Sequence, residues 1–129
     1  MEAGMSTDAQ IEQEIQDKGL TAPRVTPKDV EENIAGEFYF TGEDGVKGAS
    51  FMTTKPAGIA GSLGLLTFCV LVLRNGFTVT GESACASPEN FDAEVGRKIA
   101  RANAVNKIWP LMGYELRTQV HLRKLAGVR

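Results

Sequence analysis

The sequence predicts an α+β fold: a small antiparallel sheet, built on a β-hairpin, packed against a long helix and a C-terminal helix. Two observations carry this prediction. An apolar segment at 65–73 is followed by Asn75-Gly76 and an alternating segment at 77–82, which together are typical of a hairpin. Ser87-Pro88 then opens a segment with helical periodicity. The length of 129 residues suits one modest core.

Residues 1–20 are expected to form an acidic leader that is partly disordered or short-helical. We predict disorder over 1–7 and a short helix over 8–18 that ends at Gly19. The alternative is that this segment has no stable structure by itself, because so short a helix is marginal without packing. Residues 21–129 are expected to form a single α/β domain.

A helix, a strand and two irregular segments are predicted between the leader and the hairpin. Thr26 and Pro27 are typical of an N-cap and a first helical residue, and this second helix is expected to end at Gly36. The aromatic, alternating segment 37–41 predicts a strand. Two irregular segments should follow: a turn or loop over 42–48, and a glycine-rich loop for binding or subunit contact over 49–64.

The hairpin strands have different patterns. The first, at 65–73, is apolar at successive positions, which predicts a strand covered on both faces. Asn75-Gly76 favours a two-residue type I′ turn, because both residues tolerate positive φ. The returning strand should place Phe77, Val79 and Gly81 on one face and threonines on the other.

The two cysteines are expected to be reduced and buried. A two-residue turn places Cys69 opposite Glu82 and Cys85 opposite Leu66. The cysteines are then three positions apart along the ladder, roughly 10 Å, which is too far for a disulfide.

The strongest helix start in the chain predicts a long helix after the hairpin. Ser87 is the expected N-cap, Pro88 the first helical residue, and Glu89 lies in the first turn. The helix should run to about Trp109, where Pro110 stops it. A separate final helix is expected over 114–125.

This helix is apolar on two sides. One side is expected to form the core stripe, flanked by Ile99, and consists of Phe91, Val95, Ala102, Val105 and Trp109. Small residues lie nearly opposite: Ala93, Gly96, Ala100 and Ala104. The small side is either a solvated face of good helix formers or a close contact with another subunit, with Arg97 and Arg101 at its border.

Charge is unevenly distributed along the chain. Residues 1–45 carry 11 acids and 3 bases, and residues 46–129 carry 5 acids and 11 bases. The asymmetry indicates either an anion-binding half or two halves that attract each other. A small anionic ligand fits this modest excess better than a long duplex. With no signal-peptide pattern and no apolar run long enough to span a bilayer, we expect a cytoplasmic protein away from membranes.

The sequence contains no catalytic or metal-binding motif that predicts an enzyme. His121 is the single histidine, and we interpret it as a surface residue rather than part of a nucleophilic relay. Recognised hydrolase, phosphate-loop and paired-cysteine motifs are missing from the sequence. We therefore expect no enzymatic activity, no cofactor and no metal.

An anion-binding site at the main helix start is the remaining candidate. The N–H groups at a helix N-terminus bind anions, and arginine side chains bind phosphates. Side-chain hydroxyls and amides can bind a base or a ribose, and aromatic rings stack on bases. The alternative is that the arginines pair with the acidic leader. The nine candidate ligand-binding residues are Asn90, Phe91, Arg97, Arg101, Arg117, Phe77, Ser83, Ser87 and Arg24.

Residues 71–117 resemble the small tailed-phage proteins of the gene-49/gene-66 family, and TAPRVTPKDVEENIAGEFYFT at 21–41 is similar to their N-terminal half. The resemblance rests on three motifs: the NGF turn, the SAC-x-SP-x-NFD segment and the K-x-W-P-L-x-GY end. It covers most of the chain and implies a phage protein of the host cytoplasm.

In size and layout the chain also resembles the first type of Thoeris anti-defence sponge proteins. Those proteins bind cyclic ADP-ribose isomers and cyclic trinucleotides without cleaving them, and assemble from dimers into a hexamer. The resemblance implies sequestration of cyclic nucleotide signals by a homo-oligomer, a dimer or a hexamer. Two alternatives stay open: a phage accessory protein that binds a host or phage protein through the small-residue helix face and loop 49–64, and a nucleic-acid-binding module.

Overall fold

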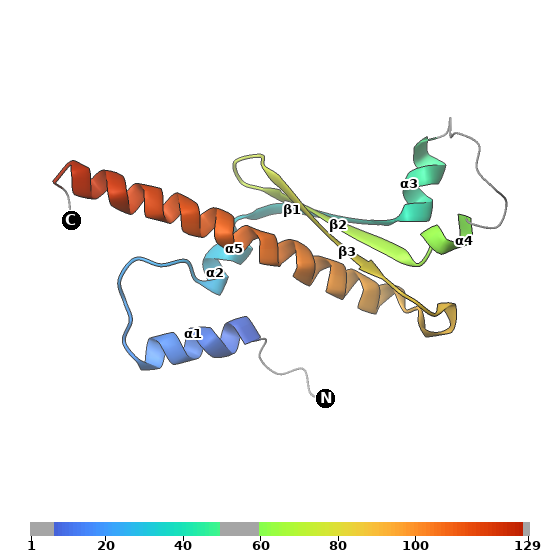
Figure 1. Ribbon diagram of the computed structural model, residues 1–129, viewed down its shortest axis with the longest axis horizontal. Coiled ribbons are helices and arrows are strands. Elements are labelled where there is room, and N and C mark those ends of the chain that lie inside the picture. The colour runs from blue at the N-terminus through green and yellow to red at the C-terminus, as the bar shows by residue number, and fades with distance from the viewer. Residues whose placement is uncertain (1–6, 50–59, 128–129) are drawn as a thin grey trace. The chain divides into compact units, whose positions relative to one another are not determined.

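The computed structural model describes residues 7–49 and 60–127, and its central feature is an antiparallel sheet in the order β1-β2-β3 (Figure 1). The predicted α+β class is confirmed. The strands are β1 (Ile34–Thr41), β2 (Leu66–Leu73) and β3 (Thr78–Ala84). The helical elements are α1 (Thr7–Asp17), α2 (Pro27–Glu32), α3 (Gly42–Ala49), α4 (Ala60–Leu63), the 3-10 turn η1 (Pro88–Asn90) and α5 (Ala93–Leu125).

The chain divides into two compact units. One, the terminal unit, comprises Met1–Asn33 and Trp109–Arg129, and the other, the sheet unit, comprises Ile34–Ile108. The boundary falls within α5, so each unit contains part of that helix. None of the helices in the described ranges has both the length and the apolar character needed to cross a membrane.

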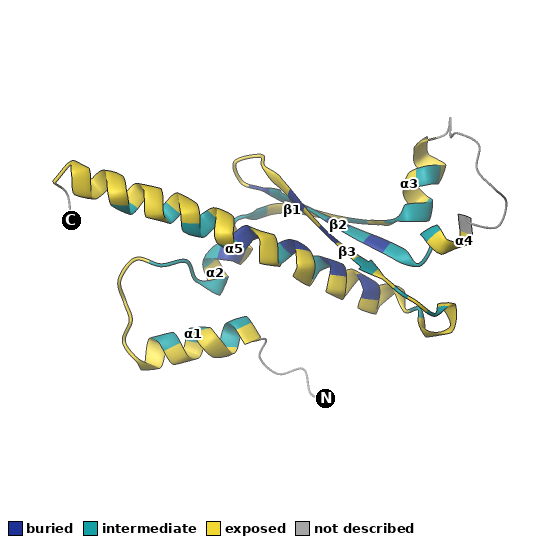
Figure 2. Ribbon diagram, in the orientation of Figure 1, coloured by how far each residue is buried: buried dark blue, intermediate teal, exposed yellow. Residues whose placement is uncertain are grey.

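The central strand β2 is buried on one face only. Its residues alternate between buried and half-buried, and Cys69 and Leu71 are fully buried (Figure 2). The prediction of a strand covered on both faces is therefore wrong. The apolar residues on the second face are Leu66, Phe68, Val70 and Val72, which stay half-buried.

The first part of α5, residues 93–108, packs on the sheet through its small residues. A Cβ at Gly81 of β3 would overlap the carbonyl oxygen of Ala100 and the amide nitrogen of Ala104. The backbones of strand and helix are thus nearly in contact, which only residues without large side chains permit. The buried residues of α5 are Gly96, Ala100, Ala104 and Ile108.

This packing overturns the predicted core stripe of the helix. Val95 and Ile99 are 51% and 47% exposed, and Ala102 is exposed as well. The sheet occupies the small-residue side, so that side is neither solvated nor a subunit contact. Periodicity identified two sides of the helix, but the glycine opposite decided which of them is buried.

The hairpin has a three-residue loop rather than the predicted two-residue type I′ turn. The amide of Gly76 donates to the carbonyl of Leu73 at 2.9 Å, and the amide of Leu73 donates to the carbonyl of Phe77 at 2.8 Å. Gly76 has φ +90°, the left-handed conformation that glycine tolerates best. One additional loop residue shifts the whole register of the hairpin.

The shifted register changes the surroundings of the cysteines and places them four positions apart along the ladder instead of three. Cys69 lies opposite Gly81 instead of Glu82, and the amide of Cys85 donates to the carbonyl of Leu65. Both thiols are free. Cys69 is buried as predicted, whereas Cys85 is half-buried, which corrects the prediction of two buried thiols.

Segment 42–48, predicted as a turn or loop, lies within helix α3. The amide of Thr41 donates to Asp44 Oδ2 at 3.0 Å, and the amide of Asp44 donates to Thr41 Oγ1 at 3.0 Å. This reciprocal capping stabilises a helix start in spite of three glycines. Of the predicted loop 49–64, residues 60–63 form α4, and 50–59 lie outside the described residues.

Helix α5 begins later than predicted. Pro88–Asn90 form the separate turn η1, and the side chain of Ser87 makes no capping hydrogen bond. Asp92 is the cap instead, because its Oδ1 accepts from the amide of Val95 at 3.0 Å. A carboxylate at this position also interacts favourably with the helix dipole.

Helix α5 also ends later than predicted, at Leu125, because it continues through Pro110. The predicted stop at Trp109 and the separate helix over 114–125 are therefore wrong. Proline removes one backbone hydrogen bond, here to the carbonyl of Asn106, but leaves the turns on both sides intact.

In the terminal unit, α1 agrees with the predicted leader helix, although it begins at Thr7, which was predicted to be disordered. Residues 1–6 lie outside the described part. Helix α2 has the predicted cap: Thr26 accepts from the amide of Asp29, and the Asp29 side chain accepts from the amide of Thr26. It ends at Glu32 rather than at Gly36, which belongs to β1.

Candidate ligand site beside Phe91

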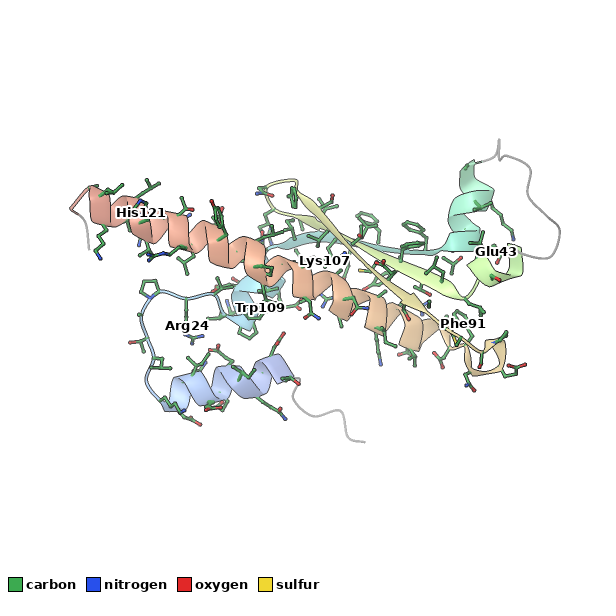
Figure 3. All side chains as sticks on the ribbon, in the orientation of Figure 1. Arg24, Glu43, Phe91, Lys107, Trp109 and His121 are labelled. Atoms are coloured by element: carbon green, nitrogen blue, oxygen red, sulfur yellow. The ribbon has the colours of Figure 1, made fainter. Side chains whose placement is uncertain are left out.

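Two hollows lie on the sheet unit where α5 begins, and Phe91 lines both of them. Figure 3 shows Phe91 in the connection between β3 and α5. The larger hollow, of about 210 Å³, is lined by Leu65, Ser83, Ala84, Cys85, Asn90, Phe91, Asp92, Val95, Gly96 and Ile99. The smaller, of about 90 Å³, is lined by Tyr39, Phe40, Thr41, Asp44, Thr67, Phe91, Ala93 and Arg97.

Phe91 is held in position by the two elements around it. It follows η1 with an extended backbone, φ −68° and ψ 128°, and its amide donates to the carbonyl of Pro88 at 3.1 Å. Asp92 then starts α5 directly after it. The ring is half-buried, so part of it remains available for contact from outside.

The larger hollow is mainly apolar, with two neutral polar side chains, Ser83 and Asn90. Asp92 is the charged residue that lines it, and its carboxylate already accepts from the amide of Val95. The helix N-terminus proposed from the sequence as an anion site is therefore partly occupied by the chain's own carboxylate. This hollow suits a flat, uncharged group, such as a base, better than a phosphate.

The lining of the smaller hollow includes one positively charged side chain, that of Arg97. Arg97 is exposed, and within the described residues its guanidinium makes no hydrogen bond or ion pair. Asp44 lies in the same hollow, and its hydrogen bond from the backbone amide of Thr41 lowers the pKa of that carboxyl. The Asp44 carboxylate is thus satisfied by its own backbone, which leaves Arg97 able to bind an anion.

Arg101, another predicted ligand residue, links α5 to β1 instead. Its Nε donates to Glu37 Oε1 at 2.7 Å, and the Tyr39 hydroxyl donates to the same oxygen at 3.1 Å. The hydrogen bond from Arg101 lowers the pKa of Glu37. Burial raises the pKa of Tyr39 to about 12, and burial also raises the pKa of the Cys69 thiol.

Arg24 lies in the terminal unit and binds the leader helix. Its two terminal nitrogens donate to the two carboxylate oxygens of Glu12 at 2.6 and 2.7 Å. This pair lowers the pKa of Glu12 to about 2. Arg24, which Figure 3 shows on the segment between α1 and α2, is therefore bound to the leader helix within the terminal unit.

Three further predicted residues do not line either hollow. The carbonyl of Ser87 accepts a hydrogen bond from the Cys85 thiol at 3.1 Å. Phe77 lies at the end of the hairpin loop and is 56% exposed. Arg117 lies on the part of α5 that belongs to the terminal unit. The structure therefore brings together Ser83, Asn90, Phe91 and Arg97.

Sequence reasoning missed several residues of this region. Thr41-x-x-Asp44 is a capping pattern and could have placed Asp44 at a helix start beside the end of β1. Thr67 and Tyr39 carry no such signal, because only the strand register brings them to the smaller hollow. Among the described residues, no group of histidine, cysteine and acidic side chains is arranged to hold a metal ion.

The terminal unit has a hollow of its own, of about 220 Å³. Its apolar lining consists of Ile11, Ile15, Val25, Pro27 and Trp109, with Asp8 and Glu12 beside them. The indole nitrogen of Trp109 is buried without a hydrogen-bond partner. Glu12, the ion-pair partner of Arg24, lies at this hollow, whereas Arg24 itself does not line it.

The fold and the hollows beside Phe91 define a small α+β protein with a candidate ligand site at the start of its main helix. The chain belongs to the phage protein (N4 Gp49/phage Sf6 gene 66) family, whose model matches residues 25–120. All residues of the two hollows beside Phe91 fall within the match, and Arg24 lies just outside it. No curated protein and no solved structure matches the chain.

Proposed function

We propose that this phage protein binds cyclic nucleotide immune signals and sequesters them without cleavage. Cyclic ADP-ribose isomers are the first candidates and cyclic trinucleotides the second. The observation that supports the proposal is the convergence of four residue types suited to a nucleotide: Ser83, Asn90, Phe91 and Arg97 surround two adjoining hollows. They come from β3, from η1, from the connection that follows η1 and from α5.

Each residue has a distinct part in this proposal. A base stacks on the ring of Phe91, a contact that contributes about 1–3 kcal/mol per base. Asn90 and Ser83 bind the base edge or a ribose hydroxyl from the larger hollow. Arg97 binds a phosphate from the smaller hollow, where its guanidinium is exposed.

The size of the hollows supports a site shared between subunits. Small-molecule sites usually have about 300–1,000 Å³, and each hollow is smaller than that. We therefore propose that the protein acts as a homo-oligomer, a dimer or a hexamer, in which a second copy completes the enclosure. The exposed residues Val95 and Ile99, which border the larger hollow, are suited to such a contact.

Calorimetric titration with cyclic ADP-ribose isomers and cyclic tri-adenylate tests the proposal. Phe91→Leu keeps an apolar residue but removes stacking, so we expect a loss of about tenfold or more in affinity. Arg97→Ala should weaken binding by a similar factor, because it removes the phosphate contact. Arg123→Ala, an exposed arginine near the end of α5, is the matched control and should leave the affinity unchanged.

The fate of the ligand distinguishes sequestration from catalysis. After incubation and heat denaturation of the protein, chromatography should recover the ligand intact. Recovery of a cleaved ligand would show an enzyme. Absence of binding to every cyclic nucleotide tested would contradict the proposal as a whole.

A second candidate function is binding to a host or phage protein. The small-residue face of α5 is no longer available for it, because Gly96, Ala100 and Ala104 are buried against the sheet. The exposed apolar residues Val95 and Ile99 are the observation that favours it. A partner captured by the wild-type chain but lost with Ile99→Arg, together with no heat of nucleotide binding, would support this function instead. A strongly salt-dependent affinity for DNA would support the third alternative, a nucleic-acid-binding module.

A further inference from the structure

Thr67 is the buried polar residue of β2, and it lines the smaller hollow beside Phe91. Its side chain is 3% exposed, and the other buried residues of the strand are apolar: Cys69, Leu71 and Leu73. Valine has the same shape as threonine and would pack here without burying a hydroxyl. Packing on the helix therefore does not explain the hydroxyl group at this position.

The hydroxyl of Thr67 makes no hydrogen bond within the ranges that the structure describes. The other two hydroxyls of the hollow are engaged: that of Tyr39 donates to Glu37, and Thr41 Oγ1 accepts from the amide of Asp44. A buried polar group without a partner is unfavourable, and in native proteins water or a ligand commonly satisfies it. The smaller hollow thus has a buried hydroxyl that is available to a ligand.

The oxygen of Thr67 lies toward the first turn of α5. A Cβ at Gly96, which lines the larger hollow, would lie 3.1 Å from Thr67 Oγ1. A side chain at this helix position would cover the hydroxyl, whereas glycine leaves it open. Phe91 lines both hollows, so the contact between Thr67 and Gly96 lies where the two hollows adjoin.

We infer that the Thr67 hydroxyl is a further ligand-binding group, which donates to a phosphate oxygen of the ligand while Arg97 binds the same phosphate. Arg97 lines the same hollow, is exposed and makes no ion pair in the described part of the chain. The two residues together give a phosphate two directed contacts, one from a buried and one from an exposed side chain. The inference rests on the proposed function for the identity of the whole ligand, but the phosphate contact can be tested without a nucleotide.

Asp44 is the acidic residue that lines this hollow, and its charge opposes an anion. It is exposed, and its Oδ2 accepts from the amide of Thr41. The carboxylate repels a phosphate bound by Thr67 and Arg97, whereas a neutral sugar would use it as a hydrogen-bond acceptor. Asp44→Asn distinguishes these ligand groups, because the amide oxygen can still accept from Thr41 and the charge is removed.

Titration of the isotopically labelled full chain with inorganic phosphate, followed by nuclear magnetic resonance at constant ionic strength, tests the contact. The wild-type chain should show saturable chemical-shift changes at the amides of Thr67 and Arg97. Thr67→Val removes the hydroxyl and keeps the shape, so it should raise the dissociation constant about tenfold. Thr67→Ser keeps the hydroxyl and should stay within about twofold of the wild type.

Thr80→Val is the matched control for the loss of a threonine hydroxyl. Thr80 is exposed, lies on the other face of the sheet and lines neither hollow. The variant should leave phosphate binding unchanged. Asp44→Asn should lower the dissociation constant for phosphate several-fold, because it removes the repulsion.

Stability measurements separate a ligand contact from a structural role of Thr67. Because the hydroxyl has no partner among the described residues, Thr67→Val should not lower the urea midpoint of the free protein. Phosphate should raise the midpoint of the wild type more than that of Thr67→Val. A lower midpoint of Thr67→Val without phosphate would show a partner within the fold and overturn the inference.

Three further results would overturn it: no saturable change at Thr67 and Arg97, phosphate binding that Thr67→Val does not weaken, or weaker phosphate binding in Asp44→Asn. Calorimetry with the cyclic nucleotides on the same variants keeps the inference apart from the proposed function. If phosphate binds through Thr67 but no cyclic nucleotide binds, the proposed function alone fails. If a cyclic nucleotide binds Thr67→Val as tightly as the wild type, the inference alone fails.

Discussion

At the scale of single residues, Gly81 sets the distance between strand and helix. Its missing side chain lets β3 approach the backbone of α5 at Ala100 and Ala104. The contact is between main chains, so no rotamer change can relieve an added atom. A substitution that adds one methyl group at Gly81 therefore tests how closely the helix packs on the sheet.

We predict that Gly81→Ala lowers the free energy of unfolding by about 3 kcal/mol or more, because overpacking against a backbone forces the helix away from the sheet. Gly113→Ala is the matched control: a Cβ there meets nothing within 4 Å, and alanine favours the helix by up to about 1 kcal/mol. Urea unfolding of both variants measures the difference. Equal stability of the two variants would show that the strand and helix are farther apart than described.

The Glu12–Arg24 pair gives a pH-dependent prediction in the terminal unit. The pKa of Glu12 lies at about 2, below its ordinary value of 4.5, because Arg24 donates two hydrogen bonds to the charged form. A carboxyl with a lowered pKa in the folded state stabilises that state above its unfolded pKa. This contribution should be complete above about pH 4.5 and disappear as the pH falls toward 2.

A nuclear magnetic resonance titration of the Glu12 carboxyl carbon measures this pKa directly. In Arg24→Met the midpoint should return toward 4.5. Lys18→Met, which removes an exposed ion pair with Glu14 in the same helix, should leave the Glu12 midpoint near 2. A wild-type midpoint near 4.5 would mean that Arg24 does not bind the leader helix in solution.

At the scale of secondary-structure elements, capping interactions decide where helices begin. Reciprocal hydrogen bonds between Thr41 and Asp44 begin α3, in a glycine-containing segment with little intrinsic preference for a helix. At α5, Ser87 and Asp92 are both residues typical of an N-cap. Only Asp92 makes the capping hydrogen bond, so η1 and α5 are separate elements.

We predict that Asp92→Ala lowers the free energy of unfolding by about 1 kcal/mol, because it leaves the amide of Val95 without its partner. Ser87→Ala should change it by much less, since the Ser87 side chain makes no capping bond. Chemical denaturation followed by circular dichroism compares the two. A larger loss in Ser87→Ala would place the helix start at Ser87, as first expected from the sequence.

At the scale of the whole molecule, burial is unevenly distributed between the two units. The sheet unit contains most of the buried apolar residues, among them Cys69, Leu71 and Ile108. Helix α1 in the terminal unit has no buried residue. Regions with few buried contacts open locally at low free energy, whereas a central strand opens only with global unfolding.

We predict the corresponding order of hydrogen exchange. Amides of Cys69 and Leu71 in β2 should exchange with opening free energies close to that of global unfolding. Amides of α1 should exchange with opening free energies near zero. Exchange followed by nuclear magnetic resonance at pH 7 measures both sets in one sample. Protection of α1 equal to that of β2 would show that the helix is packed in solution.

Local signals in the sequence determined several elements correctly. Thr26-Pro27 began α2, the aromatic alternation at 37–41 lies within β1, and the apolar segment with Asn75-Gly76 produced the hairpin. In the candidate site, Ser83, Asn90, Phe91 and Arg97 were expected and lie around adjoining hollows. These features depend on residues close in sequence, whose backbone preferences and capping bonds are readable without the fold.

The tertiary structure decided what depends on distant partners. Helix α5 has two apolar sides, and the one with small residues is buried against the sheet at Gly81. Val95 and Ile99 on the other side stay exposed. The ion pairs of Arg24 and Arg101 join residues 12 and 64 positions apart, which no local pattern specifies. Periodicity shows which sides of α5 are apolar. The close approach of the β3 backbone determines which of these sides is buried, because two main chains can come so near only where no large side chain lies between them.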